Sequence, residues 1–135
     1  LDAVKEGGTV ILAARNEEGA GSAEFEGLLR KLENPMHYYD LVMGPDYVAK
    51  DQWMVQELVN AMHHCELLYY TEGIRTEDLR DFLITPIESI EDGIERALKR
   101  HGRNAKILVL PEGPYVIPRP PVLKERLYSW QTAGI

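Results

Sequence analysis

The stretch Thr9-Val10-Ile11-Leu12-Ala13-Ala14 decides the fold of this 135-residue chain. It is a continuous apolar run, rich in β-branched residues and preceded by two glycines. Such a run is typical of a strand buried on both faces, as in a parallel sheet covered by helices. Two further apolar runs, Glu66 to Thr71 and Lys106 to Leu110, predict a second and a third buried strand.

Amphipathic helices are predicted between these strands. The clearest one runs from Ile90 to His101, with Ser89 as its N-cap and Gly102 at its end. The other predicted helices cover residues 22–32 (capped by Ser22), part of 36–43, 51–64 (with Asp51 as N-cap) and 76–82 (capped by Thr76). Strands that alternate with helices predict an α/β fold. We therefore expect a three-layer sandwich, a small, open, mostly parallel sheet flanked by helices in a Rossmann-like arrangement.

Length and composition predict one globular domain. Hydrophobic residues make up 44% and charged residues 27%, and a chain of this length holds one core. We expect a single α/β domain over residues 1–121 and a C-terminal tail or terminal helix over residues 122–135. Because the chain opens on Leu1, and its first residues resemble the last turn of a helix, we expect it to be part of a longer protein.

Charge and cysteine content argue against several classes of protein. The 15 Lys and Arg against 22 Asp and Glu give a net charge of −7, which disfavours binding to nucleic acid. The apolar runs are too short to span a membrane. A single cysteine, Cys65, excludes an internal disulfide and a cysteine-cluster zinc site, and it predicts a cytoplasmic protein.

The loops that follow the strands form the candidate binding region, because ligands of open α/β sheets bind beyond the carboxyl ends of the strands. Three segments are expected to meet there, namely residues 15–22, 47–52 and 111–115. The glycines of the first segment suggest a dinucleotide fingerprint. Glu24 stands where the third glycine is required, which favours a plain loop between strand and helix.

Lys50-Asp51-Gln52-Trp53 is the most distinctive polar cluster. The free N–H groups of a helix start and the charge of Lys50 favour an anion, and the Gln52 amide can donate to a carboxylate or accept from a hydroxyl. The cluster predicts a site for a small hydroxy acid, with Gln52 and Lys50 as substrate-binding residues. The structural alternative is an N-cap aspartate, an exposed lysine and a tryptophan packed on the sheet.

No catalytic constellation is predicted within the chain. His63 and His64 are adjacent on a helix and point in different directions, so they do not easily chelate one ion. Ser22 and Ser89 are explained as helix caps, outside any nucleophile-elbow motif. We expect no catalytic, cofactor-binding or metal-binding residue in this chain, which points to a supporting domain.

Two segments carry a family resemblance, residues 6–14 (EGGTVILAA) and residues 18–25 (EGAGSAEF). Together with residues 50–53 and the run through Pro111-Glu112-Gly113, they make residues 4–118 similar to the C-terminal domain of the nickel-dependent lactate racemase family. The resemblance implies two-domain isomerases that racemise 2-hydroxy acids with a nickel-pincer nucleotide. It implies that an N-terminal domain, not contained in this sequence, supplies the cofactor site and the catalytic residues.

The resemblance also implies a role for this domain. By this resemblance, the domain is expected to close the cleft over the substrate and to contact the substrate through Gln52 and Lys50. It is not expected to be catalytic alone. The alternative function, from another class of protein, is that of a non-catalytic module with a Rossmann-like fold. Such a module binds a small anion in the same crevice or forms a homodimer through an exposed sheet edge.

Overall fold

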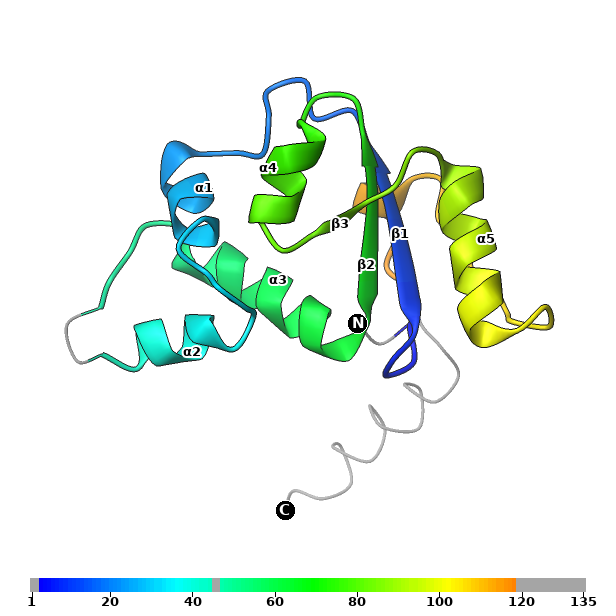
Figure 1. The fold of residues 1–135 in the computed structure, drawn as a ribbon, viewed down its shortest axis with the longest axis horizontal. Coiled ribbons are helices and arrows are strands. Elements are labelled where there is room, and N and C mark those ends of the chain that lie inside the picture. Colours follow the sequence, from blue (N-terminus) through cyan, green and yellow to red (C-terminus); the bar gives the residue numbers. More distant parts are fainter. Residues whose placement is uncertain (1–2, 45–46, 119–135) are drawn as a thin grey trace, which may run out of the picture.

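The computed structural model describes residues 3–44 and 47–118. The elements are β1 (Thr9–Ala14), α1 (Ala23–Leu29), α2 (His37–Val42), α3 (Gln52–His64), β2 (Glu66–Thr71), α4 (Thr76–Asp81), β3 (Thr85–Pro86), α5 (Ile90–His101) and the 3-10 helix η1 (Gly113–Tyr115). The strands form one parallel sheet in the order β1-β2-β3. Helices α1, α3 and α4 lie on one side of β1 and β2, and α5 lies on the other (Figure 1). The predicted three-layer α/β architecture is confirmed.

The strand register defines the two ends of the sheet. Thr9 lies opposite Glu66 and Ala14 lies opposite Thr71, so β1 and β2 pair along their whole length. We call the end at Thr9 and Glu66 the amino rim and the end at Ala14 and Thr71 the carboxyl rim. The loop after β1 and the turn after β2 therefore leave the sheet side by side at the carboxyl rim.

The main core lies between the helices on one side of the sheet. It contains Phe25, Leu28, Leu29, Leu32, Tyr38, Val55, Val59 and Phe82. The first four have the spacing of one helix face, as expected for the segment 22–32, although α1 itself ends at Leu29. Val55 and Val59, four residues apart on α3, are 0% exposed. Burial of this apolar stripe holds α3 against α1 and β2, and the N-terminal end of α3 lies toward α1 (Figure 1).

Helix α5 packs closely on the other face because it carries a glycine at the contact. A Cβ on Gly93 would lie 2.7 Å from Ile87 Cδ1 and 3.3 Å from Ile11 Cδ1. Both ends of α5 are as expected, since the Ser89 hydroxyl accepts a hydrogen bond from Asp92 N–H at 3.1 Å and Gly102 follows its last residue. The absence of a side chain at position 93 thus sets how near α5 comes to β1.

Two expectations about the strands are wrong. The first is that β1 is buried on both faces, whereas β1 is an edge strand on which Leu12 is 42% exposed. The second is a strand at Lys106 to Leu110, a segment that is extended, exposed and unpaired with the sheet in the part of the chain that the structure describes. The third strand is β3, whose two residues include Pro86. Proline gives no N–H to a sheet ladder and is confined to strand edges, so the short strand escapes a pattern search.

Three smaller expectations concern the chain ends and a cap. Residues 3–8 form turns instead of the end of a helix, with Gly7 at φ 71° and its N–H bonded to the His64 carbonyl at 2.7 Å. Arg75, and not Thr76, precedes α4 as its N-cap. The expected tail or helix over residues 122–135 lies outside the described residues. Within the described ranges, no helix is long and apolar enough to cross a membrane.

Candidate functional site at the carboxyl rim

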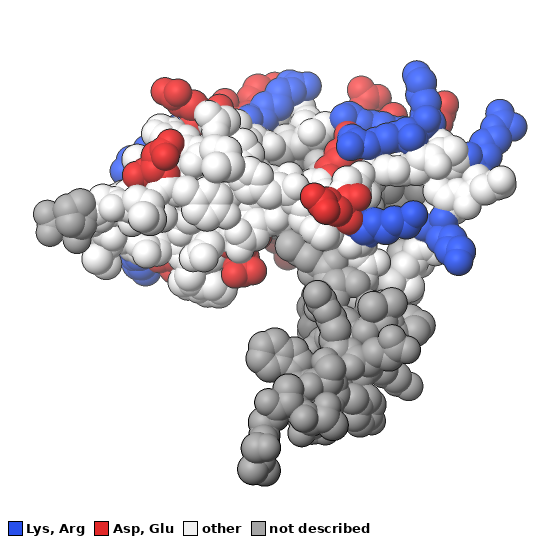
Figure 2. Space-filling model, turned by 90° about the horizontal axis from the view of Figure 1, so that it is seen from below, with Lys and Arg blue, Asp and Glu red and all other residues white. Residues whose placement is uncertain are grey.

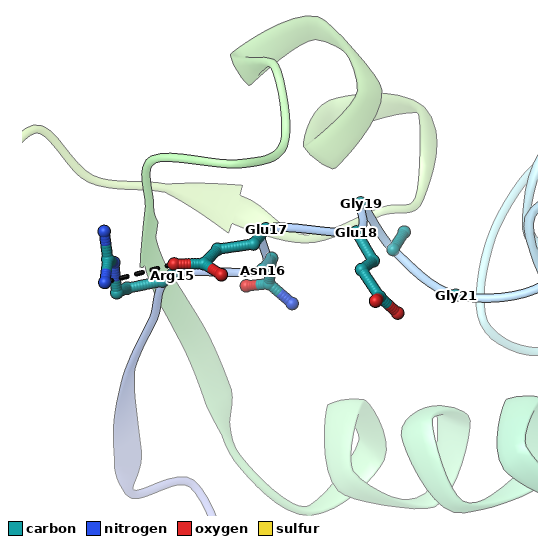
Figure 3. A pocket seen from close by; sticks show the side chains of 7 residues that line it. Arg15, Asn16, Glu17, Glu18, Gly19 and Gly21 are labelled. Carbon is teal, nitrogen blue, oxygen red and sulfur yellow. Dashed lines mark ion pairs between the residues drawn. The ribbon is translucent and has the colours of Figure 1, made fainter.

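The loop after β1 forms an open hollow at the carboxyl rim. Residues 15–21 line a concavity of about 500 Å³ (Figure 3). The backbone turns sharply in this loop, with positive φ angles at Asn16 (51°), Gly19 (80°) and Gly21 (134°). Glycine adopts such angles without strain, which explains the two glycines of the motif. The loop therefore curves around a space that its own side chains leave open.

The first residues of this loop are fixed to the end of β2. The Asn16 Oδ1 atom accepts hydrogen bonds from the Tyr69 hydroxyl at 3.0 Å and from the Thr71 hydroxyl at 3.1 Å. Gly73 passes directly against the same loop, because a Cβ at that position would lie 1.9 Å from the Asn16 carbonyl oxygen. Contacts from two neighbouring segments thus determine the position of Asn16.

A hydrogen bond joins the loop to the start of α3. The Ser22 hydroxyl accepts from Phe25 N–H at 3.1 Å, as expected of the N-cap of α1, and donates to Asp51 Oδ2 at 2.5 Å. Asp51 occupies the N-cap position of α3, but its side chain makes no capping bond and its φ is 62°. The expectation of a capping aspartate is therefore right in position and wrong in chemistry, because its carboxylate binds Ser22 instead.

The two predicted substrate-binding residues flank this aspartate. Lys50 is exposed, and its Nζ lies 3.3 Å from Glu24 Oε1. A hydrogen bond from the Glu24 backbone and another from Lys50 lower the pKa of the Glu24 carboxyl group. The Gln52 Oε1 atom accepts from Ala49 N–H at 2.9 Å, which leaves the Nε2 amide as the donor of this side chain for a ligand.

Of the three segments expected to meet, the structure brings two together. Residues 47–52 contact the 15–22 loop and α1 through the Asp51–Ser22 and Lys50–Glu24 pairs. In the described ranges no hydrogen bond or ion pair joins residues 111–115 to either segment, and the hydrogen bonds of η1 are local. Trp53 is 65% exposed, so the packed tryptophan of the structural alternative is wrong, whereas its exposed lysine is confirmed.

The amino rim has a different chemistry. The Glu66 carboxylate accepts from the Thr9 hydroxyl at 3.1 Å and pairs with Arg96 at 2.7 Å and Arg100 at 3.4 Å, and the His101 ring bonds Thr9 at 2.8 Å. Lys and Arg gather over α5 at this end of the molecule, whereas the face of α2 and α3 is largely uncharged (Figure 2). Burial raises the pKa of Glu66, but the hydrogen bonds from Thr9 and Arg96 and the nearby arginines outweigh it and lower the pKa. These charges serve to hold α5 on the sheet.

Two further points concern metal binding and Asn16. The described residues contain no group of three or more His, Cys, Asp or Glu side chains placed to hold a metal. Asn16 was not predicted as a site residue. Its signal in the sequence is weak, an asparagine two positions after a strand, although asparagine is one of the few residues that tolerate a left-handed backbone.

Fold and rim together define the class of protein, an open parallel α/β domain with its candidate site in the loops beyond the strands. The chain belongs to the lactate racemase C-terminal domain family, whose family model matches residues 2–118. The resemblance found in the sequence is confirmed.

Individual relatives agree with this assignment. The chain is 25% identical over 115 residues to the lactate racemase of Lactiplantibacillus plantarum and 27% identical over 119 residues to that of Thermoanaerobacterium thermosaccharolyticum. These matches cover 84% and 87% of this chain but 27% and 28% of the relatives. The structure of the lactate racemase apoprotein from T. thermosaccharolyticum superimposes with a TM-score of 0.76 at 26% identity, over 86% of this chain and 28% of that one. The chain thus spans little more than a quarter of the relatives that it matches.

Proposed function

We propose that this chain is the cleft-closing, substrate-contacting C-terminal domain of a nickel-pincer-dependent racemase of 2-hydroxy acids. The observation that carries the proposal is the family match over residues 2–118. The polar loops at the carboxyl rim support it. An N-terminal domain supplies the cofactor site and the catalytic groups, and this domain is not catalytic alone. A cytoplasmic location belongs to the same proposal.

The described residues of this chain do not form a metal site. No step of the nickel chemistry is therefore assigned to them. Their proposed task is to bind and orient the substrate and to exclude water when the two domains close. These tasks require fixed hydrogen-bond donors and a positive charge near the substrate carboxylate, both of which a domain without catalytic groups can supply.

Gln52 and Lys50 are the proposed substrate contacts. The Lys50 ammonium group is 67% exposed and is held only by a surface ion pair, so a substrate carboxylate can compete with Glu24 for it. Gln52 is the first residue of the 13-residue helix α3, and the helix dipole favours an anion at this end. The Gln52 Nε2 amide then donates a directed hydrogen bond that a lysine alone does not provide.

The test is racemisation of lactate by a two-domain protein that joins this chain to the N-terminal domain loaded with cofactor. We expect Gln52→Glu, which keeps the Oε1 acceptor for Ala49, to raise KM at least about tenfold, because it removes the Nε2 donor and adds a charge that repels the substrate carboxylate. The matched control is Gln56→Ala, an exposed residue one turn further along α3. If Gln52→Glu turns over lactate with an unchanged KM, Gln52 is not a substrate contact. If the wild-type protein does not turn over lactate, the proposed function is refuted.

A second candidate function has one observation in its favour. In the part of the chain that the structure describes, β1 is an edge strand with Leu12 exposed, and sheets of two molecules can pair through such an edge. This candidate is a non-catalytic module that dimerises or binds a small anion. It is favoured if the chain sediments as a dimer that a Leu12→Lys substitution dissociates, or if lactate raises its melting temperature in a concentration-dependent way without any racemase activity in the two-domain protein.

A further inference from the structure

The Asn16 side chain uses only half of its hydrogen-bonding capacity within the domain. Its Oδ1 atom accepts from two hydroxyl groups, those of Tyr69 and Thr71. Among the hydrogen bonds formed inside the described ranges, none involves its Nδ2 amide, which carries two donor hydrogens. Figure 3 shows the amide oxygen toward the strands and the nitrogen on the side of the hollow where the Glu18 side chain lies. The hollow therefore contains a donor whose direction is set by the protein.

The backbone at Asn16 supports a functional reason for this arrangement. Its φ of 51° is uncommon for a residue other than glycine. Such conformations persist where the surrounding structure determines them, and they are enriched at ligand-binding sites. Here Tyr69, Thr71 and Gly73 hold the residue in place. A fixed donor loses little conformational entropy when a ligand binds to it.

We propose that Asn16 is a substrate-binding residue whose Nδ2 amide donates to the hydroxyl oxygen of the bound 2-hydroxy acid. This inference rests on the proposed function and names a residue of the same rim. The hydroxyl, and not the carboxylate, is the group that fits, because Glu17 and Glu18 line the same hollow and repel a second carboxylate. A hydroxyl both accepts and donates, so it can accept from Asn16 while it donates to a glutamate.

The neighbouring acidic residues are consistent with a substrate hydroxyl at Asn16. Glu17 is already paired with Arg15 at 3.1 Å, so the Glu18 carboxylate is the acceptor that we assign to the substrate hydroxyl. Asn16 thereby distinguishes a 2-hydroxy acid from the corresponding acid without a hydroxyl, as expected of a site built to bind that group.

The test compares Asn16→Asp with Asn60→Asp in the two-domain protein that contains this chain. The aspartate of the first variant retains the acceptor for Tyr69 and tolerates the left-handed backbone, but it loses both donors. Asn60 is the matched control, since its Oδ1 likewise accepts from a tyrosine hydroxyl, that of Tyr39 at 2.6 Å, and it does not line the hollow. We expect KM for lactate to rise at least about tenfold in Asn16→Asp, through the lost hydrogen bond and the added charge, and to remain at the wild-type value in Asn60→Asp.

Two further measurements separate the possible outcomes. Asn16→Gly removes the donor without adding a charge, and we expect it to raise KM for lactate while leaving the inhibition constant of propionate, which lacks the hydroxyl, unchanged. Equal KM values for the Asn16 and Asn60 variants overturn the inference while wild-type turnover upholds the proposed function. If the wild type does not racemise lactate, the proposed function fails. The role of Asn16 in binding is then tested by the thermal shift that lactate causes. A shift lost in Asn16→Gly upholds binding, and an equal shift overturns it.

Discussion

The two ends of the sheet use the same kinds of residue for different purposes. At the amino rim, the Glu66 carboxylate is satisfied by Thr9, Arg96 and Arg100, so its charge is neutralised within the domain. Among the described residues, the Asn16 amide at the carboxyl rim is held through its oxygen, and the Lys50 ammonium group near α1 is paired with the exposed Glu24. Both rims are polar, but the Glu66 carboxylate is 14% exposed and enclosed by its partners, whereas the Lys50 side chain is 67% exposed.

The difference teaches how to separate structural from functional polarity in a small α/β domain. A cluster whose donors and acceptors all face one another contributes to stability and has little left for a ligand. A cluster that is fixed on one side and open on the other is prepared for binding, and its removal should alter affinity more than stability. The following predictions test this distinction, beginning with the largest expected effect.

Gly73→Ala should have the largest effect, because the added Cβ meets the Asn16 carbonyl oxygen at 1.9 Å. We expect a loss of about 3 kcal/mol in the free energy of unfolding, as for severe overpacking, measured by urea denaturation. Gly27→Ala in α1 is the control, since its Cβ meets nothing within 4 Å and alanine should stabilise the helix by about 1 kcal/mol. Equal stability of Gly73→Ala and the wild type would contradict the close packing of loop and turn.

Glu66→Gln tests the amino rim. Removing the charge weakens the hydrogen bonds from Thr9 and Arg96 and leaves Arg100 without its partner. We expect a loss of about 2 kcal/mol in the free energy of unfolding at neutral pH, typical for hydrogen bonds to a charged group. Racemase activity of the two-domain protein should not change at temperatures where both proteins are folded. A change in KM would show that the amino rim also belongs to the site.

The same carboxylate predicts a dependence on pH. Because the pKa of Glu66 is lower in the folded state than its ordinary value of 4.5, its contribution to stability is complete above that value. The contribution is lost as the pH falls through the lower, folded-state pKa. The stability difference between the wild type and Glu66→Gln should therefore shrink when melting is followed from neutral pH to below 4.5. A constant difference would refute the role of the charge.

Ser22→Ala and Ser89→Ala form a matched pair of helix caps. Both serines accept from the backbone N–H three residues later, but only Ser22 also binds across to α3, through Asp51. Loss of a cap alone should lower stability by about 1 kcal/mol in Ser89→Ala. Loss of the cap together with the Asp51 bond should lower it by about 2 kcal/mol in Ser22→Ala. Identical values in thermal melts would mean that the Ser22–Asp51 bond adds nothing.

Lys50→Ala should have the smallest effect on stability, because its ion pair with Glu24 is exposed and screened by solvent. We expect an unchanged melting temperature but a higher KM for lactate in the two-domain protein. Added salt should likewise raise the KM of the wild type for lactate, because it screens the charge of Lys50. A drop in melting temperature without a change in KM would assign Lys50 to structure.

The helices and the two long strands could be predicted from sequence because their signals are local. Ser22, Ser89 and Gly102 mark helix ends, and an unbroken apolar run marks β2. That Lys106 to Leu110 stays unpaired could not be predicted, since its apolar residues indicate only a propensity for strand. Pairing with the sheet depends on where the chain lies after α5. Conversely, β3 lacks a strong propensity and forms because Leu68 and Tyr69 already present an edge to it.

The candidate site was predicted in part, for a related reason. The prediction that residues 47–52 lie near the first loop rests on the topology of parallel strands, and in the structure Asp51 accepts a hydrogen bond from Ser22 at the end of that loop. The bond between Ser22 and Asp51 and the anchoring of Asn16 depend on contacts between residues far apart in the chain. Neither leaves a pattern in the sequence, because side-chain partners are chosen by the folded geometry.

The single cysteine of the chain has a practical consequence. Cys65 is buried at the end of α3, where its thiol donates to the Ala61 carbonyl at 3.3 Å, and burial raises the pKa of that thiol. Because the thiolate is the reactive form, the native cysteine should resist maleimide reagents. A cysteine introduced at Val48, which is 91% exposed beside the candidate site, would then carry a fluorophore without background labelling at position 65. Such a label would test whether the proposed closure of the two domains changes the surroundings of this rim.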